Sequence, residues 1–182
     1  MIRIDNLTDM ALPQLDGLFI GGGFPETHMS ALESNESFRR QLAQAIDNGL
    51  PVYAECGGLM YLARSIEWQQ EKHDMVGAIP ADIIMESKPQ GRGYVQLRET
   101  ADGLWPATSG KTIAAHEFHY SRFLNLPKSA RFAFQVLRGN GIDGEHDGYI
   151  RNNMLACYTH QRNTRNNDWV VRFVEFVRQC NS

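Results

Sequence analysis

The sequence contains no apolar run of membrane-spanning length and no signal peptide. Cysteine is scarce: Cys56, Cys157 and Cys180 are an odd number at wide spacing, with no CxxC pair among them. A disulfide framework is therefore not indicated. We expect a protein of the reducing cytoplasm that has no membrane partner.

A strong charge of either sign is also lacking. The 18 Lys and Arg residues against 21 Asp and Glu residues give a net charge of −3, and the sequence has no basic block. Proteins that bind nucleic acid or an anionic membrane surface usually carry such a block. Neither partner is therefore indicated.

Metal-binding patterns are missing as well. No HExxH motif occurs, and His116 and His119, which alone among the histidines have a suitable spacing, lack further obvious ligands nearby. We therefore predict no metal site and no cofactor in this chain.

What the sequence does contain is an apolar run, Leu50–Ala54, that leads into Glu55-Cys56-Gly57-Gly58 and then into helix-forming residues. A cysteine between a strand and a helix lies where free N–H groups and the positive end of the helix dipole favour a thiolate. The two glycines permit a sharp turn and a close approach of substrate. Cys56 is therefore a candidate nucleophile; the alternative is a small buried hydrophobic residue, the commonest state of a free cysteine.

A second glycine-rich segment, Gly21–Glu26, follows the apolar run Gly17–Ile20. It has neither the GxGxxG spacing of dinucleotide-binding loops nor the Gly-Lys-Ser/Thr of phosphate loops. Two interpretations remain. The segment can supply an oxyanion hole, in which the N–H groups of Gly22 and Gly57 stabilise a developing negative charge, or it can be a plain tight turn.

Strands and helices alternate in the N-terminal part of the chain. Residues 2–4 suggest one brief strand, and an amphipathic pattern predicts a helix from Glu26 to Asn48 with Gly49 as its C-cap. This order is typical of a parallel α/β sheet, which binds ligands at the carboxyl ends of its strands. The 182 residues correspond to one domain, able to bury roughly 70% of its unfolded surface.

The C-terminal half supplies a candidate base. A strand is predicted over Met154–Thr159, and it ends in His160. Because the carboxyl ends of parallel strands meet at one edge of a sheet, His160 is expected to lie near Cys56 and to activate its thiol. Around this site we expect a β-rich stretch at Ser65–Thr112, a hairpin within Arg131–Arg151 and a final amphipathic helix.

The segment His116-Glu117-Phe118-His119 follows apolar residues and is predicted to lie on a strand or at its end. Alternation then directs His116 and Phe118 to one face and Glu117 and His119 to the other. A glutamate beside two histidines can serve as acid–base machinery. The alternative is that these side chains satisfy one another by hydrogen bonds in a partly buried strand.

Four segments stand out: GGGFPE at Gly21–Glu26, AECGGLMYL at Ala54–Leu62, HEFHYS at His116–Ser121 and YTH at Tyr158–His160. In this order they resemble the glutamine amidotransferase domain of the cobyrinic acid a,c-diamide synthase family, and the match spans nearly the whole chain. The resemblance implies a flavodoxin-like class I α/β fold: a mostly parallel sheet with helices on both faces, plus a β-rich insertion. It also implies one glutaminase domain over residues 1–182.

In that family the glutaminase domain follows an ATP-using synthetase domain that amidates carboxylates of a corrin ring. The resemblance implies that Cys56 and His160 hydrolyse glutamine to glutamate and ammonia, with Gly22 and Gly57 as the oxyanion hole. The ammonia would serve cobyrinic acid a,c-diamide synthesis, a step of cobalamin biosynthesis. ATP and Mg²⁺ are expected in the synthetase partner and not in this chain.

The chain departs from the class I pattern at one position. Class I glutaminases commonly carry a glutamate two residues after the histidine, and this position is Arg162, which cannot accept a hydrogen bond from imidazole. The sequence therefore predicts a Cys-His dyad and identifies no group that orients the histidine. For Glu117 and His119, the resemblance implies a place near the bound glutamine or the synthetase interface.

Two other functions are compatible with the same motifs: an inactive module that only binds a synthetase, and an ammonia donor for another tetrapyrrole such as sirohaem. Family members normally open this domain with a further strand and helix, whereas here the glycine-rich segment follows Ile20 directly. We expect the domain to lack that first unit. The sheet edge would then be covered by another polypeptide or by a second copy of the chain.

Overall fold

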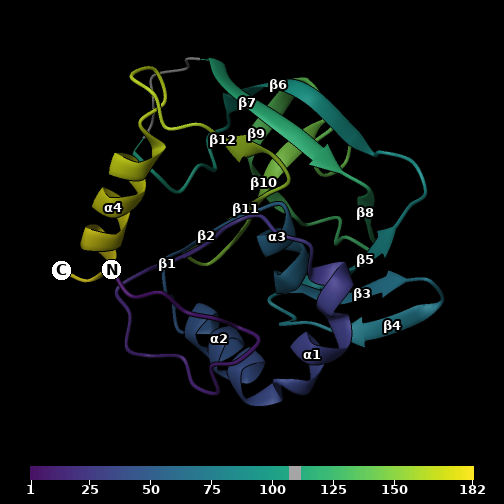
Figure 1. Ribbon diagram of the computed structural model, residues 1–182. Coiled ribbons are helices and arrows are strands. Elements are labelled where there is room, and N and C mark those ends of the chain that lie inside the picture. The colour runs from purple at the N-terminus through teal and green to yellow at the C-terminus, as the bar shows by residue number, and fades with distance from the viewer. Residues whose placement is uncertain (107–111) are drawn as a thin grey trace.

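The fold is built on two β-sheets (Figure 1). The structure is a computed structural model, which describes residues 1–106 and 112–182. The larger sheet has eight strands in the order β1 (Leu18–Ile20), β2 (Val52–Glu55), β11 (Met154–Cys157), β10 (His146–Arg151), β9 (Arg131–Arg138), β6 (Gly91–Glu99), β7 (Thr112–His119) and β12 (His160–Gln161). The smaller sheet has the order β4 (Glu71–Asp74), β3 (Ala63–Trp68), β5 (Ile79–Met85) and β8 (Ser121–Leu124).

Only part of the larger sheet is parallel. β2 pairs in parallel with β1 on one side and with β11 on the other, whereas the five remaining pairings within the described sheet are antiparallel. The expectation of a mostly parallel sheet was therefore wrong outside these three strands. Hairpin connections account for part of the difference, because closely linked neighbours such as β9, β10 and β11 pair in antiparallel fashion, while parallel pairing needs a long crossover.

The predicted β-rich stretch and hairpin are both present. The stretch from Ser65 onward forms β3 to β6, although residues 107–111 lie outside the described part of the chain. The hairpin consists of β9 and β10, which pair in register through Phe132 and Tyr149. These patterns were readable because half-buried strands alternate apolar and polar residues.

Within residues 1–106 and 112–182, helical structure occurs in five segments: η1 (Pro25–His28), α1 (Met29–Ser34), α2 (Glu36–Asp47), α3 (Gly57–Leu62) and α4 (Trp169–Cys180). The single helix expected from Glu26 to Asn48 is thus broken into three, with the last break at Asn35. The amide of Asn35 donates hydrogen bonds to the carbonyl oxygens of Asn6 and Asp9 at 3.0 and 2.8 Å. This residue turns the chain and fixes the N-terminal segment, in which residues 2–4 form no strand.

Helices cover both faces of the larger sheet, as expected. α1, α2 and α3 lie on one side of β1 and β2, and α4 lies on the other (Figure 1). Along β2, Val52 and Ala54 join the first apolar cluster, while Tyr53 joins Phe173 of α4 in the second. β2 is therefore buried on both faces, which explains its continuous apolar sequence.

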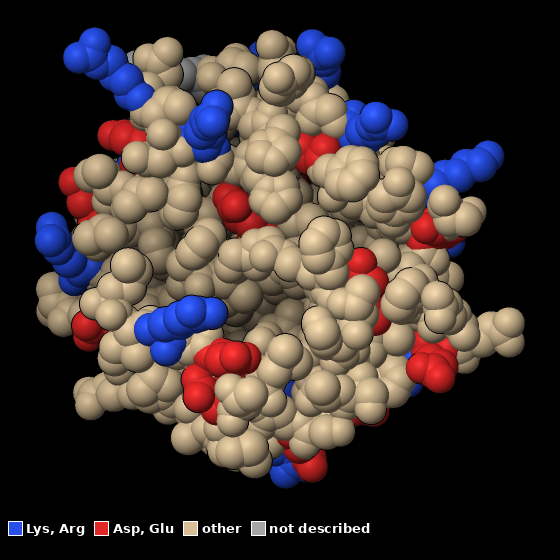
Figure 2. Space-filling view, viewed as in Figure 1, with Lys and Arg blue, Asp and Glu red and all other residues tan. Residues whose placement is uncertain are grey.

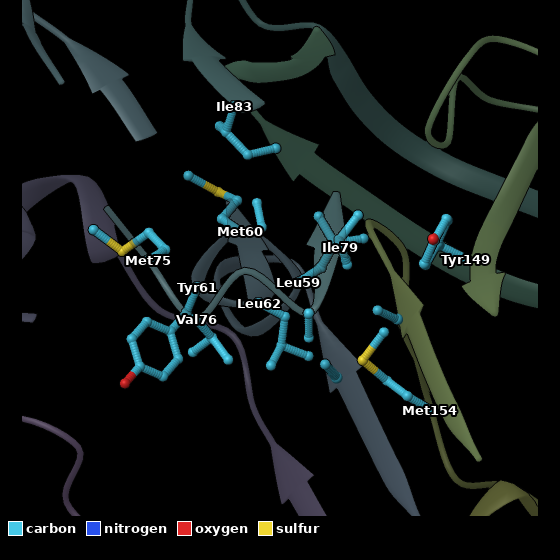
Figure 3. Close-up of a cluster of buried hydrophobic side chains, with 14 of the residues drawn as sticks. Leu59, Met60, Tyr61, Leu62, Met75, Val76, Ile79, Ile83, Tyr149 and Met154 are labelled. Atoms are coloured by element: carbon cyan, nitrogen blue, oxygen red, sulfur yellow. The ribbon is translucent and has the colours of Figure 1, made fainter. Parts of the chain in front are cut away.

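The short helix α3 lies at the centre of the first cluster. Figure 3 shows its side chains Leu59, Met60, Tyr61 and Leu62 projecting in different directions among residues of both sheets. Leu59 and Leu62 are 0% exposed. Full burial of an aliphatic side chain stabilises a fold by about 1.5–3 kcal/mol. All six residues of α3, the helix that begins after Cys56, are thus buried.

β1 forms one edge of the larger sheet, with no further strand beside it in the described residues. Phe19 is 47% exposed there. A cavity of about 410 Å³ runs along this edge between Ile2–Ile4, Leu18–Gly23 and the helices, and most of its lining is apolar. That another chain covers this edge stays a prediction. In the described parts of the chain, no helix is long and apolar enough to cross a membrane.

Candidate active site

Cys56 lies at a strained turn between β2 and α3. Its φ and ψ are 47° and −105°, an unusual conformation for a residue with a side chain. The turn is fixed by hydrogen bonds: the Cys56 N–H donates to the carbonyl oxygen of Cys157 at 2.7 Å, and the Met60 N–H donates to the carbonyl oxygen of Cys56 at 3.0 Å. Strain of this kind persists only where surrounding structure enforces it, and it concentrates at functional sites. The predicted strand–turn–helix is confirmed.

The glycine-rich segment packs directly against this turn. A Cβ atom on Gly57 would lie 2.3 Å from the carbonyl oxygen of Gly23, and one on Gly22 would lie 2.7 Å from Cε1 of His160. Neither distance leaves room for a side chain. The absence of side chains at Gly22 and Gly57 is what lets the segment, the turn and His160 meet.

His160 lies just beyond β11, where it opens the short strand β12 and pairs with His116 of β7. Its Nδ1 lies 3.4 Å from Oε2 of Glu55, and its interactions with Cys56 first and Glu55 second are the main influences on its pKa. These two partners outweigh the opposing effect of burial and raise the pKa of His160 to about 10. At neutral pH the imidazole is therefore protonated and interacts with Cys56.

Glu55, the last residue of β2, is the residue that sequence reasoning missed. It is 7% exposed, and its Oε2 lies 3.4 Å from Nδ1 of His160. Its Oε1 accepts hydrogen bonds from the Tyr53 hydroxyl at 2.6 Å and from the Gln161 N–H at 3.0 Å. The available signal was a single carboxylate in an otherwise apolar strand, directly before the candidate nucleophile.

The ring of His116 packs against one face of the His160 ring. The two rings are stacked with their centroids 4.9 Å apart and their planes 19° from parallel. Partial desolvation and then the charge of His160 lower the pKa of His116, with Arg162 contributing in the same direction and Glu55 opposing it. A neutral ring thus lies against the imidazolium and restricts its rotation.

Glu117 and His119 lie on the opposite face of β7, so the predicted alternation is confirmed. They are 2% and 5% exposed. Glu117 accepts hydrogen bonds from the N–H groups of Asn140 at 2.8 Å and Gly141 at 2.9 Å. Burial opposes ionisation of Glu117, but the His119 ring, whose Nε2 lies 3.5 Å from Oε2, and the hydrogen bonds from these backbone groups lower its pKa. A contact of either residue with substrate or a partner domain stays a prediction.

The other two cysteines lack the surroundings of Cys56. Cys157 is 0% exposed, and burial raises its pKa well above that of a free thiol. Cys180 is exposed in the last turn of α4, and partial desolvation raises its pKa. In the described residues, no group of three or more His, Cys, Asp or Glu is arranged to hold a metal ion.

The face seen in Figure 2 is hollowed near its centre, and the hollow is bordered mainly by neutral side chains with a few acidic and basic groups beside it. Two aromatic residues on neighbouring strands, Tyr94 and Phe118, are 81% and 50% exposed. The carbonyl oxygen of Phe118 lies 3.9 Å from Sγ of Cys56. The 410 Å³ cavity along β1 is lined in part by the glycine-rich segment, but its lining does not include Cys56 or His160.

Comparisons with known proteins agree on one family. The family model described as "CobB/CobQ-like glutamine amidotransferase domain" matches residues 1–168. A cobyrinate a,c-diamide synthase of Magnetococcus marinus is 41% identical over 182 residues, which cover 100% of this chain and 39% of that protein. A protein of the same name from Archaeoglobus fulgidus is 43% identical over 175 residues, 96% of this chain and 38% of the relative. The chain thus spans about two fifths of the length of these relatives.

Solved structures support the fold. The crystal structure of a glutamine amidotransferase superimposes with a TM-score of 0.63 at 17% identity, covering 90% of this chain and 79% of that one. At this identity the likeness concerns the fold alone. It confirms the expected glutamine amidotransferase type of α/β fold, in which the parallel strands carry the site described above.

Proposed function

Because this chain belongs to the CobB/CobQ-like glutamine amidotransferase domain family, we propose that it hydrolyses glutamine through Cys56 and His160 and supplies the ammonia for an amidation. One observation carries the proposal. A cysteine in a strained turn interacts with a histidine from a distant strand, beside a glycine-rich segment that packs against both the turn and the histidine.

In the first step, Cys56 attacks the side-chain amide carbon of glutamine as a thiolate, its proton residing on His160; the C–S bond forms and the carbonyl π-electron pair moves onto oxygen. The N–H of Gly57, in the first turn of α3, has no partner inside that helix and is suited to stabilise the oxyanion. The N–H of Gly22 is the second candidate. Each donor of this kind lowers a barrier by roughly 2.7–4 kcal/mol.

In the second step, the tetrahedral intermediate collapses and the C–N bond breaks. His160, already protonated, donates its proton to the leaving nitrogen, so that ammonia departs and a γ-glutamyl thioester remains on Cys56. The now neutral His160 accepts a proton from water, which attacks the thioester. Glutamate leaves, and the Cys56–His160 pair is restored.

The acceptor of the ammonia follows from the relatives' name. Since both are called cobyrinate a,c-diamide synthase, we assign the ammonia to carboxylates of cobyrinate, in cobalamin biosynthesis. The activation of those carboxylates needs a further domain or subunit, for which we expect ATP and Mg²⁺. This chain binds glutamine and delivers ammonia to that partner.

Glutamine hydrolysis by the purified chain, measured as glutamate release, tests the proposal. The Cys56→Ser variant exchanges one atom, so it should fold normally and lose at least about 10³-fold in turnover. A glutamine-like diazoketone should label Cys56 and spare Cys157 and Cys180, as mapped by mass spectrometry. Residual activity of Cys56→Ser within tenfold of the wild type, or preferential labelling of Cys180, would contradict the assignment.

A further inference from the structure

The position that usually supplies a carboxylate to the catalytic histidine of class I glutaminases holds Arg162, which is exposed. We infer that Glu55, the residue directly before the nucleophile, takes over this role as the positioning residue of His160. This inference rests on the proposed function. It places the orienting carboxylate on the nucleophile's own strand, β2.

The two oxygens of Glu55 have separate tasks. Oε1 accepts hydrogen bonds from the Tyr53 hydroxyl at 2.6 Å and from the Gln161 N–H at 3.0 Å, which fix the carboxylate in place. Oε2 is turned toward Nδ1 of His160 at 3.4 Å. Since Nδ1 faces Glu55, Nε2 is the nitrogen left for Cys56, as the reaction needs.

The two groups that donate hydrogen bonds to Oε1 of Glu55 are themselves held in place. Tyr53 is 0% exposed and lies in an aromatic cluster, with ring centroids 4.9 Å from Trp105 and 4.9 Å from Trp169. Gln161 follows His160 directly, so one carboxylate holds both the ring of the histidine and the backbone next to it. The carboxylate is thus prearranged before any substrate binds.

Another buried carboxylate nearby is already engaged. Asp147 is 0% exposed and accepts hydrogen bonds from the N–H groups of Tyr158 and Thr159 at 2.9 and 3.1 Å, and from the Thr159 hydroxyl at 2.5 Å. It supports the turn that leads into His160. Glu55 is therefore the carboxylate that contacts the ring.

The Glu55→Gln variant tests the inference, because it keeps the shape and lets the amide oxygen keep the hydrogen bonds from Tyr53 and Gln161. The amide nitrogen then faces the Nδ1 proton of His160, donor against donor. We expect kcat for glutamine hydrolysis to fall about 10²–10⁴-fold with KM within about threefold. The NMR titration of His160 should also move to lower pH.

Two further variants complete the test. Glu33→Gln removes a carboxylate–histidine hydrogen bond of the same kind, 2.8 Å long, to His73 on the surface, and should change the titration of His73 but not that of His160. Tyr53→Phe removes one support of Oε1 and should move kcat and the His160 titration in the same direction as Glu55→Gln, by less. This variant decides the question if Glu55→Gln does not fold.

The outcomes separate the inference from the proposed function. A wild-type chain that hydrolyses glutamine, together with a Glu55→Gln variant that keeps kcat within threefold and an unchanged His160 titration, would overturn the role of Glu55 alone. A wild-type chain without glutaminase activity would count against the proposed function. The titration would then still decide whether Glu55 positions His160.

Discussion

At the scale of single residues, the charge state of His160 governs the chemistry. Its ordinary pKa of 6.5 is raised to about 10 by Cys56 first and Glu55 second. A pKa raised on folding means that the protonated ring stabilises the native state. This contribution is complete below about pH 6.5 and is lost as the pH rises through about 10.

A pH titration tests this pairing. In the wild type, the NMR signals of His160 should titrate near pH 10, whereas in Cys56→Ala they should titrate at lower pH because the principal partner is gone. Glu55 remains, so part of the shift should persist. Identical titration curves for the two proteins would show that Cys56 does not contact the ring.

The three histidines near the site should differ in their effect on turnover. His160→Asn should reduce kcat about 10²–10⁴-fold, because only this ring is assigned proton transfer. His116→Asn removes a stacked ring, and His119→Asn removes a buried group with its own partner, so each should cost less. Steady-state kinetics on the three variants decides the order. If His119→Asn lowers kcat more than His160→Asn does, the assignment of the base to His160 is wrong.

At the scale of elements, the site consists of a strand–turn–helix and a glycine-rich segment that fit only as a pair. The turn at Cys56 presents the sulfur and the first N–H groups of α3, and the Gly21–Glu26 segment closes against it. β12 then returns alongside β7 and brings His160 over the turn. Close backbone approach, more than any single side chain, sets this geometry.

Alanine substitutions at the neighbouring residues Gly22 and Gly23 should differ in their effect on kcat. A Cβ on Gly22 would lie 2.7 Å from Cε1 of His160 and must displace the ring, so Gly22→Ala should lower kcat at least about tenfold. A Cβ on Gly23 meets nothing within 4 Å, so Gly23→Ala serves as the matched control and should retain activity. Equal kinetics for the two variants would mean that the segment yields to the added methyl group.

At the scale of the whole molecule, two apolar clusters on opposite faces of the larger sheet hold the site between them. One joins α1, α2 and α3 to both sheets, and the other joins α4 to the larger sheet. β2 contributes alternate residues to each cluster, so the strand that ends at Cys56 is fixed from both sides. The strand that leads into the nucleophile turn thus contains three residues, Val52, Tyr53 and Ala54, that are all 0% exposed.

Cavity formation in the first cluster should lower the stability of the whole chain. Ile79 of β5 is 0% exposed and lies near α3, as Figure 3 shows, so Ile79→Ala should reduce the free energy of unfolding by about 2–5 kcal/mol. Val171, 51% exposed on α4, provides the control, and Val171→Ala should change it by less than about 0.5 kcal/mol. Urea denaturation measures both. Similar midpoints would mean that β5 and α3 are not packed as described.

The sequence by itself determined the features that depend on neighbouring residues. The strand–turn–helix at Cys56, the strand ending near His160 and the two faces of His116-Glu117-Phe118-His119 all follow from local patterns. Strand alternation and the strand-to-helix change are short-range properties of the backbone, so they can be read directly from the order of side chains.

The tertiary structure decided the features that join distant segments. Glu55 and His160 are 105 positions apart, and nothing local to either one indicates that they meet. The break at Asn35 depends on carbonyl groups of the N-terminal segment, and the antiparallel part of the sheet depends on which strands become neighbours. Such contacts form only when the chain has packed, because packing and pairing among many segments are settled together.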